Sequence, residues 1–479
     1  QGLEIKKFPQ KNHITRPNRP DNWESLTDNE RKAWRIRVSK IAQRNRGIDG
    51  ERVVVLQDFA VAEELAGRER FYIPHSLDFR GRVYPVPHFN QQRASHVKSL
   101  LEFADGVRVG DDGAYFLAIH VANCGDFEKV SKRSFEDRVQ WTIQNEELIR
   151  KVGNDPQGTY DVWRDADKPF EFVAACIDYA QFLDVGDDYV SHLPIALDGS
   201  NSGLQHYSAA LRSPEGALVN LVPSDVPSDV YQAVCDRVIQ IVERDAANGD
   251  PTALIVQKNG VTRSLVKRNV MTFAYSSEQY GFADQQRVDL MEPLAIKVLE
   301  AKLPEHPYGI DNGFKASLYI AKAVWTAVTE IVKDASEGMK FFQKCAAALA
   351  HERKGVMWMT PVGLPVLHKY TDYDVKRVQL FLYDKSVPVT EAKSFDKVEG
   401  DSVLKRIQAN IRVKPSEHIR KEKAKSAIAP NVIHSMDSAH LMMVVLAAKE
   451  KGIEHFSLIH DSHLEGQSAH TWRIHGGTG

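Results

Sequence analysis

Two short segments far apart in the chain each place an aspartate after a run of apolar residues. Asp198 follows Leu193–Leu197, and Asp461 lies two residues after Ile459, which ends a second apolar run. A buried strand that delivers a carboxylate to a cleft has this pattern. A lone aspartate here is more often a helix cap or turn residue, but a pair can hold two divalent ions about 3.5 to 4 Å apart and promote in-line displacement at phosphorus. Because 263 positions separate the two, a shared site requires a discontinuous domain.

Between these segments lies a basic stretch with helical spacing. At about 100° per residue, Arg263, Lys267, Met271 and Tyr275 form a stripe along one side of a helix. Lys267 can neutralise a triphosphate and protonate a departing pyrophosphate, and Arg263 can grip phosphate oxygens through its planar guanidinium. A surface helix with an ordinary basic face is the alternative. Together with the two aspartates, the stripe favours the chemistry of a nucleotide polymerase.

Five segments occur in the order found in one known family. They are Asp78–Tyr84 (DFRGRVY), Asp198–His206 (DGSNSGLQH), Arg263–Tyr275, Ser426–His434 (SAIAPNVIH) and Ile459–Ser462 (IHDS). With them the chain resembles the single-subunit bacteriophage-type RNA polymerases, which include the organellar enzymes. One tetrapeptide would be weak evidence, whereas five ordered segments cover most of the chain. The resemblance implies a DNA-directed RNA polymerase, a nucleotidyltransferase that uses two metal ions.

The resemblance implies a role for each matching residue. Asp198 and Asp461 would bind two Mg²⁺ ions, with the Gly199 carbonyl as a further ligand. Lys267 would be the third catalytic residue, and Arg263 would hold the incoming triphosphate with it. The implied ribose contacts are Tyr275 and His434, and the implied contacts to template, hybrid or primer end are Arg80, Arg82, Gln205, His206 and Ser462.

Gly203 bears on the choice between RNA and DNA synthesis. The related DNA polymerases resemble this chain in an aspartate-led motif, but they carry a bulky glutamate five residues after that aspartate, where it blocks a ribose 2′-hydroxyl. Here glycine occupies that position. It leaves room for the hydroxyl, to which Tyr275 or His434 could offer a hydrogen bond. The alternative is that Gly203 only permits a tight backbone turn.

A β-rich region between Trp358 and Thr390 resembles the family's hairpin that enters the promoter major groove. We expect this hairpin near residues 365–395. Arg377 and Gln379 are the candidate promoter readers, because these side-chain types make paired hydrogen bonds with guanine and adenine edges. From the residues alone, a hairpin that only packs on the neighbouring domain is nearly as good an interpretation.

The expected fold is a helix-rich, mixed α+β, right-hand polymerase fold with palm, fingers and partial thumb. We expect the thumb-like segment at residues 1–67, the palm at 68–214 and 435–479, and the mostly helical fingers at 215–434. Local patterns predict a helix capped by Asp28, a second helix over Leu56–Leu65, and an amphipathic helix over Ser228–Val242 capped by Ser228. Short strands are expected at 71–74, 82–86 and 193–197.

Charge distribution is compatible with a nucleic-acid groove although the net charge is only −2. Arg31–Arg46 contains seven basic and no acidic residues, and Lys405–Lys425 contains eight basic and two acidic residues. Both patches could follow a phosphate backbone. A solvated surface is an equally good interpretation of either patch alone.

No feature of the sequence indicates a membrane or secreted protein. The apolar run Leu441–Ala448 is far shorter than the ~20 residues of a membrane span, and the four cysteines are scattered, which fits a reducing cytosol. We expect a cytoplasmic monomer, in the infected host cell if the protein is viral. Its expected partners are double-stranded DNA template and promoter, the RNA transcript and ribonucleoside triphosphates, with no membrane.

Two departures from the family pattern suggest alternatives. Only 77 residues precede Asp78, where the family carries several hundred, and the segment after Ser462 does not resemble the family's. We therefore expect extension of an RNA primer on a preformed hybrid without initiation at a closed promoter. The alternatives are a catalytically weak or inactive nucleic-acid-binding fragment, and a two-metal nuclease, which needs the same ions but not the Lys267/Tyr275 helix.

Overall fold

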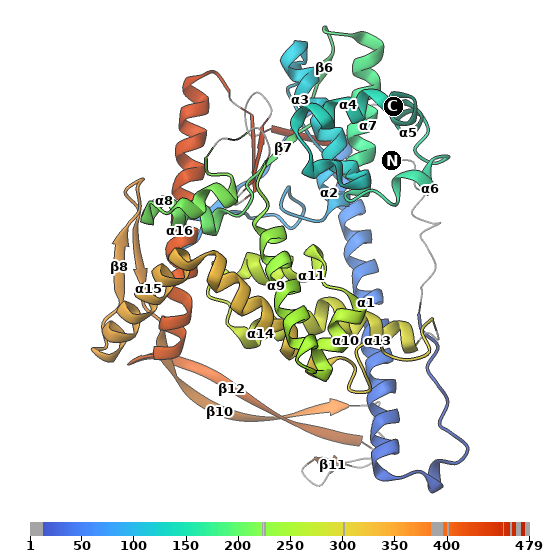
Figure 1. Ribbon diagram of the computed structural model, residues 1–479, viewed down its shortest axis with the longest axis vertical. Coiled ribbons are helices and arrows are strands. Elements are labelled where there is room, and N and C mark those ends of the chain that lie inside the picture. Colours follow the sequence, from blue (N-terminus) through green and yellow to red (C-terminus); the bar gives the residue numbers. More distant parts are fainter. Residues whose placement is uncertain are drawn as a thin grey trace.

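The structure is a computed structural model, shown in Figure 1. It describes residues 13–222, 224, 227–299, 302–384, 396–399, 402–453, 455–459, 462–465 and 471–474. Helices dominate this part of the chain and small sheets lie among them, which confirms the helix-rich mixed α+β class. None of the described helices is both long and apolar enough to cross a membrane.

The first helix, α1 (Asp28–Ala66), is capped by a reciprocal pair of hydrogen bonds. The Thr27 side chain accepts the backbone N–H of Glu30, and the Glu30 carboxylate accepts the backbone N–H of Thr27 at 2.7 Å. The cap predicted at Asp28 is therefore wrong by one residue. A hydroxyl followed three residues later by a glutamate can satisfy two free amides at once, which Asp28 alone cannot.

Helix α1 continues without a break for 39 residues. The separate helix predicted over residues 56–65 is wrong, because those residues belong to α1. The apolar pattern weakens around Gly47 and Gly50, but both lie on open faces of the helix with nothing close to a potential Cβ. Glycine there lowers helix propensity without ending the helix.

A three-stranded antiparallel sheet joins distant parts of the sequence. Its order is β13 (Phe456–Ile459), β14 (Ser462–Glu465) and β7 (Ile195–Asp198). Ser462 pairs with Asp198 across β14 and β7. The strand predicted at 193–197 is present, displaced toward its C-terminal end.

Further sheets of two or three short strands lie beside this one. Their strands are β1 (Phe71–Tyr72) with β15 (Thr471–Ile474) and β4 (Leu101–Phe103), β2 (His75–Leu77) with β3 (Val83–Pro85), and β5 (Val107–Arg108) with β6 (Val190–Ser191). The strands predicted at 71–74 and 82–86 are thus confirmed in shorter form. The pairing of β15 with β1 and β4 places the end of the described chain next to its early strands.

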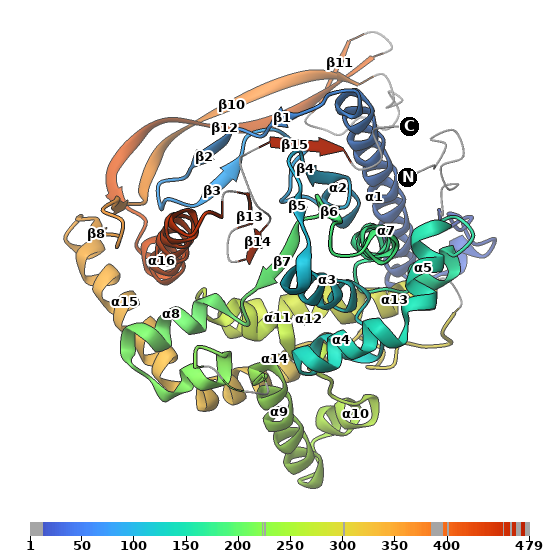
Figure 2. The ribbon, with the colours of Figure 1, turned by 90° about the horizontal axis from the view of Figure 1, so that it is seen from above.

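Two helical clusters supply most of the apolar core. One comprises α2 (Ser95–Lys98), α3 (Gly110–Gly125), α4 (Phe135–Gln144), α5 (Glu146–Asn154), α6 (Tyr160–Trp163) and α7 (Pro169–Val185). The other comprises α8 (Ser202–Leu211), α9 (Val230–Ala247), α10 (Pro251–Asn259), α11 (Arg263–Phe273), α12 (Gln279–Gln286), α13 (Glu292–Leu299), α14 (Phe314–Ile331), α15 (Lys333–His351) and α16 (Lys421–Glu450). Seen from above, α3 and α7, then α8 and α11, then α16 lie around β7, β13 and β14 (Figure 2).

Helix α9 follows its predicted pattern, with one correction. The apolar positions predicted for its inner face are all buried; they are Val230, Val234, Val238 and Ile241. The cap is Asp229 and not Ser228, because the Asp229 carboxylate accepts the free amides of the first turn. Helical spacing therefore predicted the buried face better than the first residue.

A long β-ribbon extends from the helical body. Strand β10 (Thr371–Asp384) pairs with β12 (Ser402–Ile419), and β11 (Lys397–Glu399) joins the outer edge of β12. A short hairpin of β8 (Val356–Met359) and β9 (Pro365–His368) precedes the ribbon. The hairpin expected near 365–395 is therefore longer than predicted and includes a second strand that continues to Ile419.

Candidate active site

The two aspartate segments predicted to share a site belong to neighbouring strands. Asp198 ends β7, and Ser462, the first residue of β14, lies opposite it. Strand β13 ends at Ile459 and pairs with the same β14. His460 and Asp461 lie outside the described residues, so the convergence of the two carboxylates stays a prediction.

The donors in these segments fit hard divalent ions. Carboxylate and carbonyl oxygens are the donors that Mg²⁺ prefers, and Gly199, which is exposed, has no side chain to screen its carbonyl. The pairing of β14 with β7 supports a common location for the donors. Within the described residues no group of three His, Cys, Asp or Glu side chains could hold a metal; the proposed centre includes Asp461, which that set does not contain.

Helix α11 separates a buried face from the predicted basic stripe. Its buried residues are Val266, Asn269, Val270 and Phe273. Lys267 is exposed and Arg263 is half-buried, so both cations lie off the buried face, as the spacing predicts. Tyr275 follows just after the last helical residue, and it packs partly buried against the apolar core.

The segment that follows β7 approaches α11 at both ends, directly at Tyr275 and through Tyr231 at Arg263. At the first end, the Arg263 guanidinium lies over the Tyr231 ring, 5.0 Å from its centroid, and the Tyr231 hydroxyl donates to the Ser200 carbonyl at 2.9 Å. At the other end, the hydroxyl oxygens of Tyr275 and Ser202 lie 3.1 Å apart. Helix α11 is therefore linked to the residues that directly follow the first aspartate strand.

Lys132 adds a third cation to the stripe. It ends a short 3-10 helix, Phe127–Lys132. Desolvation, then the positive charge of Arg263 and more weakly that of Lys267, lower the pKa of Lys132 below the ordinary value, against the opposing charges of Asp126 and Asp229. Lys132 therefore lies in the electrostatic neighbourhood of the Asp229–Arg263 ion pair. Helical spacing could not indicate Lys132, because it lies on another element, 131 positions before Arg263.

His434 and Tyr275 lie together, with ring centroids 4.8 Å apart. The Arg80 Nη1 atom lies 2.7 Å from His434 Nδ1. Burial, and then the charges of Arg82 and Arg80, lower the pKa of His434 to about 3, so the ring is neutral near pH 7. Because a guanidinium only donates hydrogen bonds, Nδ1 accepts from Arg80 and the ring proton lies on Nε2. His434 therefore presents a hydrogen-bond donor beside Tyr275.

Asp78 fixes Arg80 in this arrangement. Arg80 donates from Nε and Nη2 to Asp78 Oδ2 at 2.9 and 2.6 Å. Burial alone would raise the pKa of Asp78, but the hydrogen bonds and charge of Arg80 outweigh it and hold the pKa below its usual range. Arg80, predicted as a nucleic-acid contact, thus also determines which nitrogen of His434 carries the proton.

Gly203 lies where a side chain would collide with its neighbours. A Cβ atom at this position would lie 2.6 Å from the Ala274 Cβ and 3.5 Å from Tyr275 Cζ. Gly203 is the second residue of α8 and has no positive φ, so a tight turn is not the reason for glycine. The absent side chain instead lets α8 pack closely against Ala274, next to Tyr275.

Arg82 and His206 meet at a buried carboxylate, Asp437. Arg82 Nη2 lies 3.2 Å from Asp437 Oδ2, and His206 Nε2 lies 2.9 Å from Oδ1. Burial would raise the pKa of Asp437, but the hydrogen bond and charge of His206, and then Arg82, lower it below its usual value. Asp437 was not among the predicted residues. Its position in the sequence could have indicated it, because Asp437 lies three residues after His434 and therefore on the same face of the helix.

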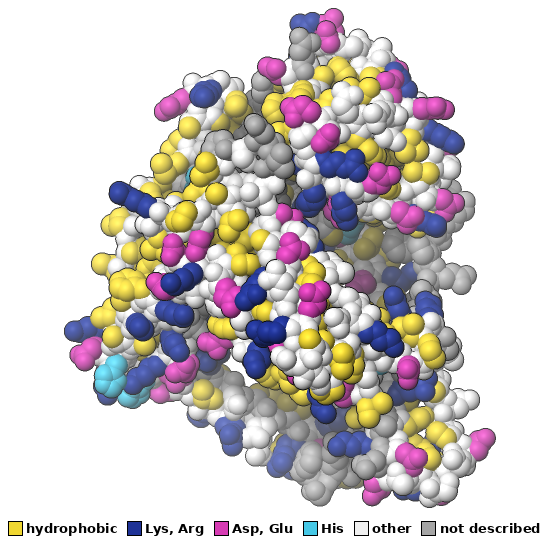
Figure 3. Space-filling model, in the orientation of Figure 1, with side chains coloured by type: hydrophobic (Ala, Val, Ile, Leu, Met, Phe, Trp, Pro, Cys, Tyr) yellow, Lys and Arg dark blue, Asp and Glu magenta, His cyan; other side chains and the backbone are white. Residues whose placement is uncertain are grey.

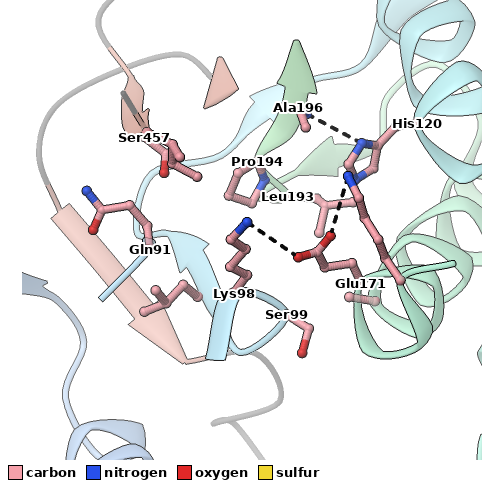
Figure 4. Close-up of a pocket in the computed structure, with 13 residues that line it drawn as sticks. Gln91, Lys98, Ser99, His120, Glu171, Leu193, Pro194, Ala196 and Ser457 are labelled. Carbon is pink, nitrogen blue, oxygen red and sulfur yellow. Dashed lines mark hydrogen bonds and ion pairs between the residues drawn. The ribbon is translucent and has the colours of Figure 1, made fainter. Parts of the chain in front are cut away.

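A cavity of about 120 Å³ lies behind β7 (Figure 4). Buried His120 reaches from α3 to the edge of the strand, where its Nδ1 accepts the Ala196 N–H at 3.4 Å. Burial lowers the pKa of His120 to about 4, so it is neutral and able to accept near pH 7. Lys98 and Glu171 line the same cavity, and the Lys98 Nζ atom lies 4.0 Å from Glu171 Oε1. His120 thus supports β7 two residues before Asp198.

Comparison with known proteins places this chain in a family. The sequence profile of the DNA-dependent RNA polymerase family matches residues 107–469. The chain belongs to this family. It is 34% identical to the DNA-directed RNA polymerase of Enterobacteria phage T3 over 93% of this chain and 51% of the relative. T7 RNA polymerase of Escherichia phage T7 is 33% identical over 92% of this chain and 50% of the relative.

A plant member of the DNA-dependent RNA polymerase family gives a similar result. DNA-directed RNA polymerase 2, chloroplastic/mitochondrial, of Nicotiana sylvestris is 33% identical over 93% of this chain and 41% of the relative. The chain therefore spans about half, or less, of the length of these polymerases. The resemblance to phage and organellar polymerases is confirmed at the level of the family.

The other residues predicted to contact nucleic acid lie on separate elements of the chain. Arg377 and Gln379 are exposed on β10, opposite Asn410 and Gln408 of β12. Side chains two residues apart on a strand point to the same face, so both are placed on one side of the ribbon. Gln205 instead donates to the Val219 carbonyl at 2.8 Å. Their contacts with nucleic acid stay predictions.

The two basic patches fall on different elements. Arg31–Arg46 belongs to α1, and Lys405–Lys425 runs from β12 into α16. On the face drawn in Figure 3, Lys and Arg side chains are interspersed with Asp and Glu, in line with the small net charge of −2. Phosphate contact by either patch stays a prediction.

Proposed function

We propose that the chain catalyses DNA-directed RNA synthesis. The 3′-hydroxyl of an RNA primer would attack the α-phosphorus of a ribonucleoside triphosphate, and pyrophosphate would leave. The observation that carries this proposal is the link between α11 and the segment that follows β7, direct from Tyr275 to Ser202 and through Tyr231 from Arg263 to Ser200. It supports a common site for the residues proposed to bind the triphosphate, the sugar and the metal.

The cations and the aspartates divide the chemistry. Arg263 and Lys132 would hold the β- and γ-phosphates, and Lys267 would neutralise the developing charge and protonate the leaving pyrophosphate. Two Mg²⁺ ions bound by Asp198, Asp461 and the Gly199 carbonyl would activate the 3′-hydroxyl and stabilise the leaving oxygen. This division explains why three cations gather on the triphosphate side.

The sugar would be selected by Tyr275, His434 and Gly203 together. Gly203 lets α8 pack closely beside Ala274 and Tyr275 without a side chain between them, and the Tyr275 and His434 rings offer hydrogen-bonding groups to the sugar. A ribose 2′-hydroxyl would find partners there, whereas a deoxyribose would leave them without one. Arg82 and His206, held at Asp437, would border the neighbouring template and primer end.

We further assign the parts of a right hand to the chain. The thumb-like part would be residues 1–67, which include α1, the palm 68–214 and 435–479, and the fingers 215–434 with the β10–β12 ribbon as promoter reader. A palm in two parts is supported by the pairing of β7 with β14 and of β4 with β15. Double-stranded promoter DNA, a transcript, a monomeric state and a cytoplasmic location belong to the same proposal.

Primer extension tests the function. The chain would be mixed with Mg²⁺, ribonucleotides and a labelled RNA primer annealed to a DNA template. We expect stepwise lengthening that requires ribonucleotides and falls steeply with salt, because the basic contacts act through release of counterions. The K267Q variant should extend poorly, whereas K258Q, which changes an exposed lysine of α10, should extend normally.

Two outcomes contradict the proposal. Shortening of the primer would indicate a two-metal nuclease. A primer that is bound but unchanged, with Mg²⁺ present, would indicate an inactive nucleic-acid-binding chain. The length of the labelled product therefore separates the three alternatives in one gel.

A further inference from the structure

Asp229 performs two tasks with one carboxylate. Its Oδ1 accepts the backbone N–H groups of Tyr231 and Gln232 at 3.0 and 3.1 Å and so caps α9. The same carboxylate receives Arg263, with Nε–Oδ2 at 2.6 Å and Nη2–Oδ1 at 3.1 Å. Because the helix cap fixes the carboxylate, the carboxylate can fix the guanidinium.

The Tyr231 ring contacts the Arg263 guanidinium from a second direction. The Arg263 Cζ atom lies over the ring, 5.0 Å from its centroid. The Tyr231 hydroxyl in turn donates to the Ser200 carbonyl, two residues beyond β7. Asp229 and Tyr231 thus set the position of Arg263 relative to the aspartate strand. A guanidinium has five N–H donors, so the two bonds to Asp229 leave most of them for a ligand.

We propose that Asp229 is a positioning residue for the triphosphate, acting through Arg263. This inference rests on the proposed function of the site. The negative charge of Asp229 opposes an anionic ligand, but it is neutralised at contact distance by Arg263, and Lys267 is a further cation on the same helix. The main effect of Asp229 is to hold a long side chain, which otherwise samples many rotamers, in one orientation toward the phosphates.

A purely structural role, capping α9, is the competing explanation. Asparagine caps helices about as well as aspartate, so D229N keeps the cap and removes the charge that binds Arg263. Asp250 provides a matched control. It caps α10 in the same way, accepting from Thr252 and Ala253 at 2.7 and 3.0 Å, and it has no ion pair in the described part of the chain.

The test measures binding of inorganic tripolyphosphate to the full chain by calorimetry. We expect D229N to weaken binding by about tenfold, the effect of losing one charge-assisted hydrogen bond, and D250N to leave it unchanged. In an R263Q background D229N should have no further effect, because the role of Asp229 passes through Arg263. In primer extension D229N should raise the ribonucleotide KM by a similar factor and change kcat less.

The outcomes separate this inference from the proposed function. Equal binding by D229N and the unchanged chain, or an equal loss in D250N, overturns the positioning role while extension still supports polymerase activity. Weakening by D229N that persists in R263Q also overturns it. Binding that depends on Asp229 in a chain that extends no primer supports the inference and rejects the function. A chain that binds no tripolyphosphate rejects both.

Discussion

Replacing Gly203 with alanine is the smallest change that tests how closely α8 approaches the sugar pair. The new Cβ would lie 2.6 Å from the Ala274 Cβ, against 3.4–4 Å for ordinary contact. Because both Cβ atoms are attached directly to the backbone, no side-chain rotation can separate them. The clash can be relieved only if the backbone of one segment moves. Overpacking of this kind costs about 1–3 kcal/mol, whereas alanine in a helix gains about 0.5–1 kcal/mol over glycine. We therefore expect a net local destabilisation of about 1 kcal/mol.

Gly47 in α1 supplies the matched control, because it is helical with nothing within 4 Å of a potential Cβ. G47A should gain only the higher helix propensity of alanine. The stability changes of the two variants should therefore differ by the cost of overpacking at Gly203, about 1–3 kcal/mol. Amide hydrogen exchange measures this locally, since 1.4 kcal/mol is a tenfold change in opening. G203A should accelerate exchange in residues 202–211 and 263–275, and G47A should slow it in α1.

The same experiment has a functional arm. Displacement of Ala274 also displaces Tyr275, so G203A should raise the ribonucleotide KM several-fold, and G47A should leave it unchanged. Exchange in 202–211 that is unchanged or slower in G203A would refute the packing argument. Faster exchange with an unchanged KM would refute the link between Gly203 and the sugar pair.

Three further predictions concern neighbouring residues. Y275F keeps the ring but loses the hydroxyl that faces Ser202, so discrimination against deoxynucleotides should relax by about tenfold while ribonucleotide addition slows less; equal losses for both sugars would contradict this. Since the folded pKa of His434 is about 3 against 6.5 when unfolded, the unfolded chain binds more protons between these values, and stability should fall as pH drops below 6.5. The free energy of unfolding should fall by up to about 2 kcal/mol at pH 5. Urea unfolding of H434N should not show this part of the pH dependence. K132Q should raise the KM for ribonucleotides at low salt more than K258Q, as measured by steady-state extension; equal values would remove Lys132 from the triphosphate site.

Local periodicity predicted the parts of the fold that depend on one element. The buried face of α9 and the basic side of α11 follow from residue spacing alone. Caps were misplaced by one residue at both Asp28 and Ser228, because several polar residues stand near each helix start and the backbone geometry decides among them. Continuity of α1 was missed because two glycines interrupt its apolar pattern without any packing conflict.

Residues that act through tertiary contacts gave no local signal. Asp229 binds Arg263 from another element, and the influence of Arg263 on Lys132 likewise depends on the folded chain. The orientation of His434 likewise depends on Arg80, 354 positions away. The proposed roles of the two aspartates and of Tyr275 came instead from the motifs that contain them, which occur in the same order as in the family. Asp198 is now placed beside Ser462 by strand pairing, whereas Asp461 lies outside the described residues.

The proposed function requires Asp198 and Asp461 to hold metal in one site. When hydrogen peroxide is added, Fe²⁺ bound in place of Mg²⁺ reduces it to hydroxide and a hydroxyl radical that cuts the backbone close to the ion, so the cleavage pattern reports which segments surround the metal. If the two aspartates share a site, cuts should appear near both residue 198 and residue 461 and should be suppressed together by excess Mg²⁺ and by either D198N or D461N. Cuts near only one aspartate, or cuts at the second that survive substitution of the first, would contradict a shared site.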